Sequence, residues 1–239
     1  MDNLNNKVAF VTGGSKGIGY GVAAALSAMG VKVGITSRNK TEAEKAAKEI
    51  TASGKGEVIG IEADVRDLES QKKAIQQVTD KWGQLDVLVA NAGVGHFGSI
   101  EELTPEQWQQ TIDTNLTGVF YSLKAAIPEL KKSKGYIFTI SSLAGTNFFA
   151  GGSAYNASKF GVTGFTQAAM LDLRDDDIKV TTIMPGSVAT HFNDHNPSDE
   201  DAWKIQKEDI GELVVDLLKM NQRALPSKIE IRPTKPPQK

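Results

Sequence analysis

Short apolar runs alternate with longer helical stretches along the whole chain of 239 residues. The first six runs are continuous and rich in β-branched residues, as in strands that are covered on both faces. Strands that alternate with helices favour a parallel sheet with right-handed crossovers. The sequence therefore predicts an α/β fold, a doubly wound parallel sheet with helices on both of its faces. The predicted strands are Val8–Val11, Val31–Thr36, Val58–Ile61, Leu85–Ala90, Tyr136–Ile140, Val180–Met184 and Ile229–Ile231.

Several of the predicted helices have recognisable ends. Gly30 follows the first helix, at a position where glycine commonly stops one. Thr41–Glu44 and Thr104–Gln107 have the pattern of capping boxes, and the second has proline at its first helical position. Pro128 is expected to end or kink the helix that the second box opens.

The composition argues against several classes of function. The formal net charge of −2 provides no basic field for nucleic acid. The chain has no cysteine and only three scattered histidines, so no metal site is expected. No apolar run approaches the roughly 20 residues of a membrane span, and the polar N-terminus lacks the plan of a signal peptide. We therefore expect a cytoplasmic protein that binds neither nucleic acid nor membranes.

No linker or repeat divides the chain, so residues 1–239 are predicted to form a single domain. The segment Asn193–Asp201 is polar and contains proline, which indicates a loop or the mobile part of a substrate lid over about residues 190–208. The end of the chain, residues 233–239, is rich in proline and lysine and is predicted to be a flexible tail.

A glycine-rich turn, Thr12–Gly19, follows the first predicted strand and opens the first helix. Its glycines allow the backbone to approach a pyrophosphate that faces the helix N-terminus. The spacing is G-x-x-x-G-x-G, and such a turn alone could serve only steric needs. Its place in the first strand–helix unit favours nucleotide binding, and the whole domain is then a dinucleotide-binding one. The predicted contacts are Gly13, Ser15, Lys16, Gly17, Ile18 and Gly19.

The end of the second predicted strand indicates which dinucleotide binds. An acidic residue there would bind the ribose 2′-hydroxyl of NAD. This chain has Ser37 and Arg38 instead, and the guanidinium group offers a fork of donors suited to a 2′-phosphate. Lys16 adds a second positive charge, whereas the nearest acid downstream is Glu42. We therefore predict NADP; the alternative is that both cations are solvated surface residues.

Two further segments end predicted strands at the edge where ligands bind in open α/β sheets. Asp64 and Val65 end the third strand and are placed to meet the adenine. Asn91, Ala92 and Gly93 end the fourth, where small residues allow a cofactor to approach. Asn91 could equally be a helix cap or a turn residue.

Tyr155 follows Ser142 by thirteen residues, and Lys159 comes four residues later. Tyrosine and lysine at i and i+4 share one helix face, so the ammonium group can favour the phenolate and lower the pKa of the phenol. Together the phenol, ammonium and hydroxyl can protonate a carbonyl while hydride arrives from elsewhere. Chance alone gives about 0.4 Tyr-x-x-x-Lys pairs in such a chain, so the isolated pair could be a surface aromatic beside a solvated lysine.

In their order and spacing these motifs resemble the short-chain dehydrogenase/reductase family. The resemblance extends from about Lys7 to Thr190, most of the chain. It implies a seven-stranded parallel Rossmann sheet with three helices on each face. The motifs that carry it are Thr12–Gly19, Asn91-Ala92-Gly93, Asn115, Ser142, Tyr155-x-x-x-Lys159 and Pro185-Gly186.

The resemblance implies roles for single residues. Tyr155 is similar to the family's general acid/base, and Lys159 to the residue that binds the nicotinamide ribose and lowers the pKa of that tyrosine. Ser142, rather than its neighbour Ser141, matches the donor that polarises the substrate carbonyl. Asn115 resembles the helix residue that holds a water in the proton relay; without the family it would be a strained or capping asparagine.

Other matches concern the cofactor and the assembly. Pro185, Gly186, Val188 and Thr190 resemble the segment that fixes the nicotinamide carboxamide, through the backbone of Val188 and the hydroxyl of Thr190. Ser15, Lys16 and Arg38 resemble the NADP-preferring branch. The family also implies a homodimer or a homotetramer.

The expected reaction is NADPH-dependent reduction of a ketone or aldehyde of a small molecule, by hydride transfer with tyrosine as proton donor. The alternative is an NADP-binding regulator on the same fold, without turnover, but the intact Ser142, Tyr155 and Lys159 favour an enzyme. Among enzymes, 3-oxoacyl carrier-protein reductases usually finish with a glycine-rich segment. The ending Ser227–Pro233, together with Val94–Gly98, is closer to sepiapterin-reductase-like and general carbonyl reductases.

The walls of the substrate site are predicted at Gly93–Phe97, Leu143–Gly152 and Ser187–Asn193. Phe97, Phe148 and Phe149 in these walls would suit an apolar or aromatic carbonyl compound. Ordinary core or interface packing explains these aromatics equally well.

Overall fold

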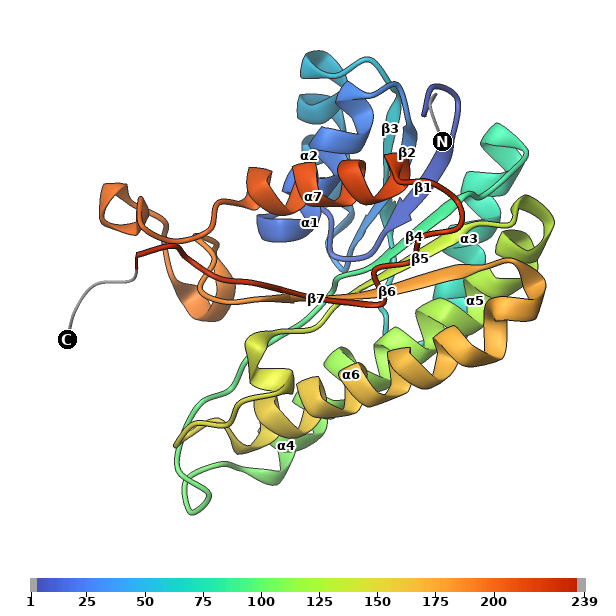
Figure 1. Cartoon of the computed structure of the whole chain (residues 1–239). Helices are drawn as coiled ribbons and strands as arrows, with labels where there is room; N and C mark the ends of the chain where they lie inside the picture. Colours follow the sequence, from blue (N-terminus) through green and yellow to red (C-terminus); the bar gives the residue numbers. More distant parts are fainter. Residues whose placement is uncertain (1–3, 236–239) are drawn as a thin grey trace.

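The computed structural model describes residues 4–235 as a seven-stranded, wholly parallel sheet flanked by helices (Figure 1). The strand order is β3-β2-β1-β4-β5-β6-β7. The strands are β1 (Val8–Val11), β2 (Lys32–Ser37), β3 (Val58–Glu62), β4 (Val87–Ala90), β5 (Tyr136–Ile140), β6 (Lys179–Pro185) and β7 (Lys228–Ile231). The helices are α1 (Gly17–Ala28), α2 (Lys40–Ser53), α3 (Leu68–Trp82), α4 (Pro105–Ile112), α5 (Gly118–Ser133), α6 (Ser153–Leu173) and α7 (Lys207–Lys219). The predicted fold class is confirmed.

Two separate cores cover the two faces of the sheet, because successive residues of a strand point to opposite sides. In β1, Ala9 and Val11 belong to the core beneath α1, α2 and α7, whereas Val8 and Phe10 belong to the core beneath α3, α5 and α6. All four side chains are 0–1% exposed. Figure 1 shows α7 on the side of α1 and α2, and α5 and α6 on the other. Burial on both faces explains why the strands are continuous apolar runs.

Glycines bring α1 and α7 into close contact. A Cβ atom on Gly21 of α1 would overlap the carbonyl group of Lys207, and one on Gly211 of α7 would lie 2.6 Å from the carbonyl oxygen of Gly21. The ammonium group of Lys207 lies 4.7 Å from the centroid of the Tyr20 ring. The first turn of α7 is therefore fixed against the helix that follows the glycine-rich turn.

The predicted helix ends are partly correct. The backbone of Gly30 adopts φ of 81° just after α1, and Thr104 forms the complete predicted capping box with Gln107. The capping box predicted at Thr41 is wrong. The cap of α2 is Asn39, whose side-chain oxygen accepts the N–H of Glu42 at 3.2 Å. Thr41 lies inside the helix because asparagine two residues earlier caps at least as well.

Pro128 does not end its helix, since α5 continues to Ser133. Leu130, beyond the proline, is fully buried in the core, and this packing outweighs the one missing backbone bond. The predicted single helix is also divided. A π-helical turn, Asp113–Thr117, joins α4 to α5, and it ends with the N–H of Gly118 donated to the carbonyl of Asp113.

Because all strands are parallel, their carboxyl ends meet at one edge of the sheet, which lies to the left in Figure 1. Beyond β6 the chain runs through two short 3-10 turns, Phe192–Asp194 and Asp199–Asp201, before α7 begins. Backbone bonds from Ala189 to Ile205 and from Ile205 to Ser187 close the base of this loop. The predicted tail over 233–239 lies mostly outside the described residues. Within residues 4–235, no helix combines the length and the apolar character of a membrane span.

Candidate active site

A cavity of about 1050 Å³ runs along the carboxyl edge of the sheet. Its wall begins at the glycine-rich turn and the end of β2, and it extends past the ends of β4 and β5 to the start of α6. Every predicted catalytic and cofactor-binding residue lines this cavity except Gly19 and Asn115. Of the predicted substrate walls, Phe97 and Leu143–Gly152 do not line it. Predicted residues as far apart in the sequence as Gly13 and Thr190, 177 positions, therefore share one wall.

The glycine-rich turn has the backbone that its composition predicts. Gly13 and Gly17 adopt φ of 65° and 59°, in the left-handed region that favours glycine. Gly19 does not face the cavity, but a Cβ atom there would overlap the carbonyl of Gly13. Lys16 is the N-cap of α1 and forms no side-chain cap bond. The helix N-terminus therefore presents N–H groups and a positive dipole end toward an anion.

Asn91 and Thr12 hold the turn in place. The side-chain amide of Asn91 donates to the carbonyls of Thr12 at 2.9 Å and Gly13 at 3.1 Å. The hydroxyl of Thr12 accepts the N–H groups of Asn91 and Ala92 at 3.0 and 3.1 Å. Asn91 therefore organises the turn; it also lines the cavity, and its contact with a cofactor stays a prediction. Thr12 stands in the glycine-rich motif, but no role was predicted for its hydroxyl.

The end of the cavity near β2 and β3 is positively charged. Arg38 is exposed and forms no ion pair with any residue in the range 4–235. Asp64 is held by Arg66, whose Nη2 lies 2.6 Å from the carboxylate and whose Nε lies 3.1 Å from both of its oxygens. This bonding is the main cause that holds the pKa of Asp64 below its usual value. Arg66 lines the same cavity and was missed, although its partner Asp64 stands only two residues before it.

At the other end the structure brings Ser142, Tyr155 and Lys159 together. Ser142 follows β5, and its hydroxyl accepts the N–H of Ala144 at 3.1 Å. Tyr155 and Lys159 lie on the first turns of α6, with the ammonium group 5.7 Å from the centroid of the phenol ring. The hydroxyl of the neighbouring Ser141 is used elsewhere: it bonds to the carbonyl of Lys159 at 3.1 Å and to Thr163 at 2.9 Å.

Burial controls the protonation of the two titrating side chains. It raises the pKa of Tyr155 above 10, and a hydrogen bond with Ser142 lowers it by less. It also lowers the pKa of Lys159 from 10.5 to about 8. The ammonium group donates to the carbonyl of Ile140 at 2.9 Å. The expectation that Lys159 lowers the pKa of the phenol is therefore wrong for this structure, in which desolvation dominates.

Asn115 occupies the π-helical turn and is fully buried. Its side-chain oxygen accepts the N–H of Val94 at 2.8 Å, and its amide donates to the carbonyl of Val94 at 2.9 Å and to Ser158 at 3.0 Å. The residue thus joins the loop after β4 to α6. It is neither a cap nor a cavity-lining residue, and its water-holding role stays a prediction.

The segment after β6 closes the cavity over the glycine-rich turn. Thr190 is nearly buried, and a Cβ atom on Gly17 would lie 3.4 Å from it. Val188 pairs with Ile205. Within the following loop, the carboxylate of Asp201 lies 2.6 Å from His195 and 2.5 Å from Lys204.

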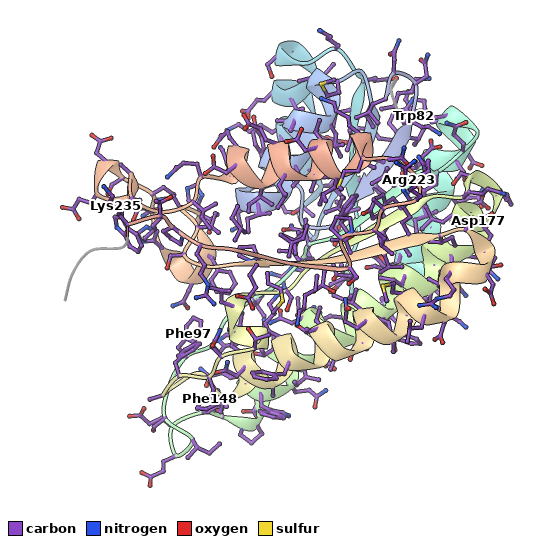
Figure 2. The ribbon with its side chains drawn as sticks, in the orientation of Figure 1. Trp82, Phe97, Phe148, Asp177, Arg223 and Lys235 are labelled. Carbon is purple, nitrogen blue, oxygen red and sulfur yellow. The ribbon has the colours of Figure 1, made fainter. Side chains whose placement is uncertain are left out.

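The aromatic residues of the predicted walls are not core residues. Phe97, Phe148 and Phe149 are 43%, 87% and 48% exposed. Core packing, one of the two alternatives, is therefore wrong for them. Figure 2 shows Phe97 and Phe148 at the same end of the molecule, near the start of α6.

A parallel doubly wound sheet with this cavity at its carboxyl edge defines a Rossmann-type dinucleotide site. The sequence pattern of the short chain dehydrogenase family matches residues 7–201. The chain belongs to this family of oxidoreductases.

Individual proteins agree with this assignment. A trans-4-hydroxycyclohexanecarboxylate dehydrogenase of Sinomonas cyclohexanicum is 38% identical, over 79% of this chain and 75% of that protein. An alcohol dehydrogenase of Thermococcus sibiricus, solved with 5-hydroxy-NADP, has a TM-score of 0.90 at 29% identity, over 98% of this chain and 99% of that one. A 3-ketoacyl-(acyl-carrier-protein) reductase of Brucella melitensis, solved with NADH, has a TM-score of 0.88 at 25% identity, over 97% of this chain and 99% of that one.

Proposed function

We propose that this protein reduces a ketone or aldehyde to an alcohol with NADPH, and that Tyr155 donates the proton. One observation carries the proposal. A single cavity joins a glycine-rich anion-binding turn and an exposed Arg38 at one end to Ser142, Tyr155 and Lys159 at the other.

The residues of the cavity fit a nicotinamide dinucleotide. The pyrophosphate would be held by the N–H groups at the start of α1, where the two left-handed glycines remove side chains from its path. Pro185–Thr190 would hold the nicotinamide end, since this segment passes over the turn. The volume of about 1050 Å³ is at the upper end of ligand cavities, as an extended dinucleotide with a substrate requires.

The charge near β2 supports a preference for NADP over NAD. No carboxylate stands at Ser37 or Arg38, and Asp64 is already paired with Arg66. Lys16 and Arg38 both line the cavity there. A 2′-phosphate would meet two cations, whereas the one unpaired acid that residues 4–235 contribute to this part of the lining is Glu42, in the first turn of α2 and not at the end of β2. The Thermococcus protein with 5-hydroxy-NADP agrees with this preference, while the Brucella protein was solved with NADH.

The side chains at the other end can stabilise the charge that develops on a carbonyl oxygen. When bound, the nicotinamide supplies or accepts the hydride. Ser142 and Tyr155 are then the donors to the oxygen, and the phenol delivers its proton. The raised pKa of Tyr155 keeps this proton in place at neutral pH, as reduction requires. Proton donation of this kind typically contributes about 10²–10⁴-fold.

Absorbance decay of NADPH against a panel of ketones, aldehydes and quinones tests the proposal. At least one compound should be reduced, and Tyr155→Phe should lower its kcat by about 10²-fold or more. If no compound is reduced faster than by this variant, the enzyme proposal fails. NADPH binding without turnover would then favour the regulator.

We also propose that the protein is cytoplasmic and forms a homodimer or homotetramer. Apolar side chains of α4, α5 and α6 that are 41–53% exposed support the assembly; these are Trp108, Phe120, Phe160 and Leu171. The ring centroid of Phe120 in α5 lies 6.0 Å from that of Phe165 in α6. The helices α5 and α6 therefore contribute to one apolar surface. Light scattering after size exclusion gives the mass directly, and a monomer of 25.7 kDa would contradict the proposal.

A further inference from the structure

The ring of Tyr155 lies within a group of phenylalanines that come from three different loops. Its centroid is 5.4 Å from that of Phe97 and 5.6 Å from that of Phe192. Phe97 in turn lies 6.3 Å from Phe192 and 5.9 Å from Phe149. These separations fall in the range of favourable edge and tilted aromatic pairs. We call Phe97, Phe149 and Phe192 the aromatic cluster.

The aromatic cluster is exposed although its members pack together. Phe97, Phe149 and Phe192 are 43%, 48% and 36% exposed, and none of them belongs to either of the two cores. Phe192 lines the cavity beside the reacting groups. An apolar group of this kind at the mouth of a polar cavity is typical of a ligand contact.

Two glycines provide the space that the rings occupy. A Cβ atom on Gly95 would lie 2.6 Å from the ring of Phe192 and 3.0 Å from that of Phe97. A Cβ atom on Gly152 would lie 2.5 Å from the ring of Phe149. Such distances are well below contact between carbon atoms. Any side chain at Gly95 would therefore displace Phe192 from Tyr155.

The loop after β6 holds Phe192 from the other side. Asn193, the next residue, has left-handed backbone angles, with φ 56° and ψ 48°, which are uncommon for a residue other than glycine. The base of the loop is closed by the pairing of Val188 with Ile205. Its far part is tied by Asp201 to Lys204. The position of Phe192 is thus set by the loop backbone as well as by Gly95.

We propose that Phe192, seated on Gly95, is a specificity-determining residue that selects carbonyl compounds carrying an apolar ring on or around the carbonyl carbon. The inference rests on the proposed function, because it places that carbonyl beside Tyr155. A ring can pair with the ring of Phe192, which lines the cavity and is backed by Phe97, whereas a linear alkyl chain gains contact area without this geometry. Selection for rings then follows from the aromatic cluster.

Binding measurements test this without requiring turnover. The protein is saturated with NADP⁺, and the dissociation constants of acetophenone and 2-octanone, two ketones with equal numbers of carbon atoms, are measured by ligand-observed NMR. Phe192→Ala should raise the dissociation constant of acetophenone about tenfold or more and that of 2-octanone less than about threefold. Gly95→Ala should act in the same direction, and Phe192→Leu should keep affinity for 2-octanone while it loses the preference for the ring.

Phe148→Ala is the matched control: although Phe148 was predicted in a substrate wall, it does not line the cavity, is 87% exposed and forms none of the ring contacts found in residues 4–235. It should leave both dissociation constants unchanged, and circular dichroism checks that every variant is folded. Equal losses for both ketones, or no loss for acetophenone, would overturn the inference.

Kinetics with NADPH separate the two proposals. We expect Phe192→Ala to raise KM for acetophenone more than it lowers kcat. If the binding preference appears but neither ketone is reduced faster than by Tyr155→Phe, the proposed function fails while the role of Phe192 in recognising rings stands.

Discussion

Lys159 lies on α6 with its ammonium group against the carbonyl oxygen of Ile140, and its side chain is almost completely buried. Its partners in the structure are a carbonyl dipole and the face of the Tyr155 ring, not a carboxylate. Desolvation therefore decides its pKa of about 8. The folded chain holds this cation at a cost that a neutral side chain would not incur.

Lys159→Met should reveal this cost as a pH dependence of stability. Below pH 8 the folded and unfolded states both bind the proton, whereas from about pH 8 to pH 10.5 the unfolded state binds more, so the free energy of unfolding rises with pH. We expect the variant to be more stable at pH 7, by on the order of 2–3 kcal/mol, and the difference to shrink toward pH 10. Urea unfolding at four pH values, without nucleotide, measures it.

Lys73→Met, a change at an exposed lysine of α3, is the control and should show a difference that does not vary with pH. A constant difference for Lys159→Met as well would mean that burial does not lower this pKa.

Side chains whose partners are fixed by local spacing could be predicted. Tyr155 and Lys159 share one helix face, and Ser142 ends a strand beside that helix. Arg66 was missed although its partner Asp64 stands only two residues before it. Phe192 lies in the predicted wall Ser187–Asn193, but its contact with Tyr155 joins separate loops and could not be predicted. The error about the phenol pKa has the same origin: helical spacing places the ammonium group near the ring, but it does not show how little water surrounds both.

Helix packing at the N-terminal end of α7 depends on the absence of two side chains. Gly21 of α1 and Gly211 of α7 allow the backbones of the two helices to approach until the carbonyl of Lys207 lies over Gly21. This contact connects the loop over the active site to the helix that starts at the glycine-rich turn. Its loss should therefore affect the stability of the fold as well as the geometry of the cavity.

Gly21→Ala should lower the free energy of unfolding by about 1–3 kcal/mol, as for overpacked sites, because the added methyl group overlaps backbone atoms that cannot move alone. Gly164→Ala is the matched control, since Gly164 lies inside α6 and a methyl group there would meet no atom within 4 Å. It should raise stability by about 0.5–1 kcal/mol through helix propensity. Urea denaturation of both variants provides the comparison, and equal effects would contradict the close contact.

The strands and the helix caps differ in how well sequence predicts them. Strands buried on both faces were located to within about two residues, because their apolar content follows directly from that burial. The cap of α2 was misplaced because Asn39 and Thr41 carry competing signals two residues apart. Pro128 does not end α5, one of its two predicted effects, because the packing of Leu130 overrides a local preference.

At the scale of the whole molecule, the cavity crosses the sheet from the end of β2 to the end of β6. A ligand that fills it contacts elements from both halves of the chain, so its binding should stabilise the fold as a unit. Binding to the folded state alone adds about 2.7 kcal/mol at a concentration of 100 times Kd.

NADPH should therefore raise Tm by roughly 5–10 °C at that excess, for a chain of this length. NADH at the same concentration should raise Tm less, since it lacks the phosphate for Lys16 and Arg38. Arg38→Asp should reverse this order, while Arg223→Asp, far from the cavity lining, should not (Figure 2). Thermal scans settle the matter: equal shifts with both nucleotides for the unmodified protein would contradict the assigned cofactor preference.

The backbone pairing of Val188 with Ile205 has a consequence for how this architecture can diversify. The sixteen residues from Ala189 to Lys204 form a loop whose two ends are joined by backbone hydrogen bonds. Doubling the length of such a loop costs only about 0.6 kcal/mol of closure entropy. The sequence and length of the loop that covers the reacting groups can therefore change while the positions of the sheet, the glycine-rich turn and the proton donor stay the same.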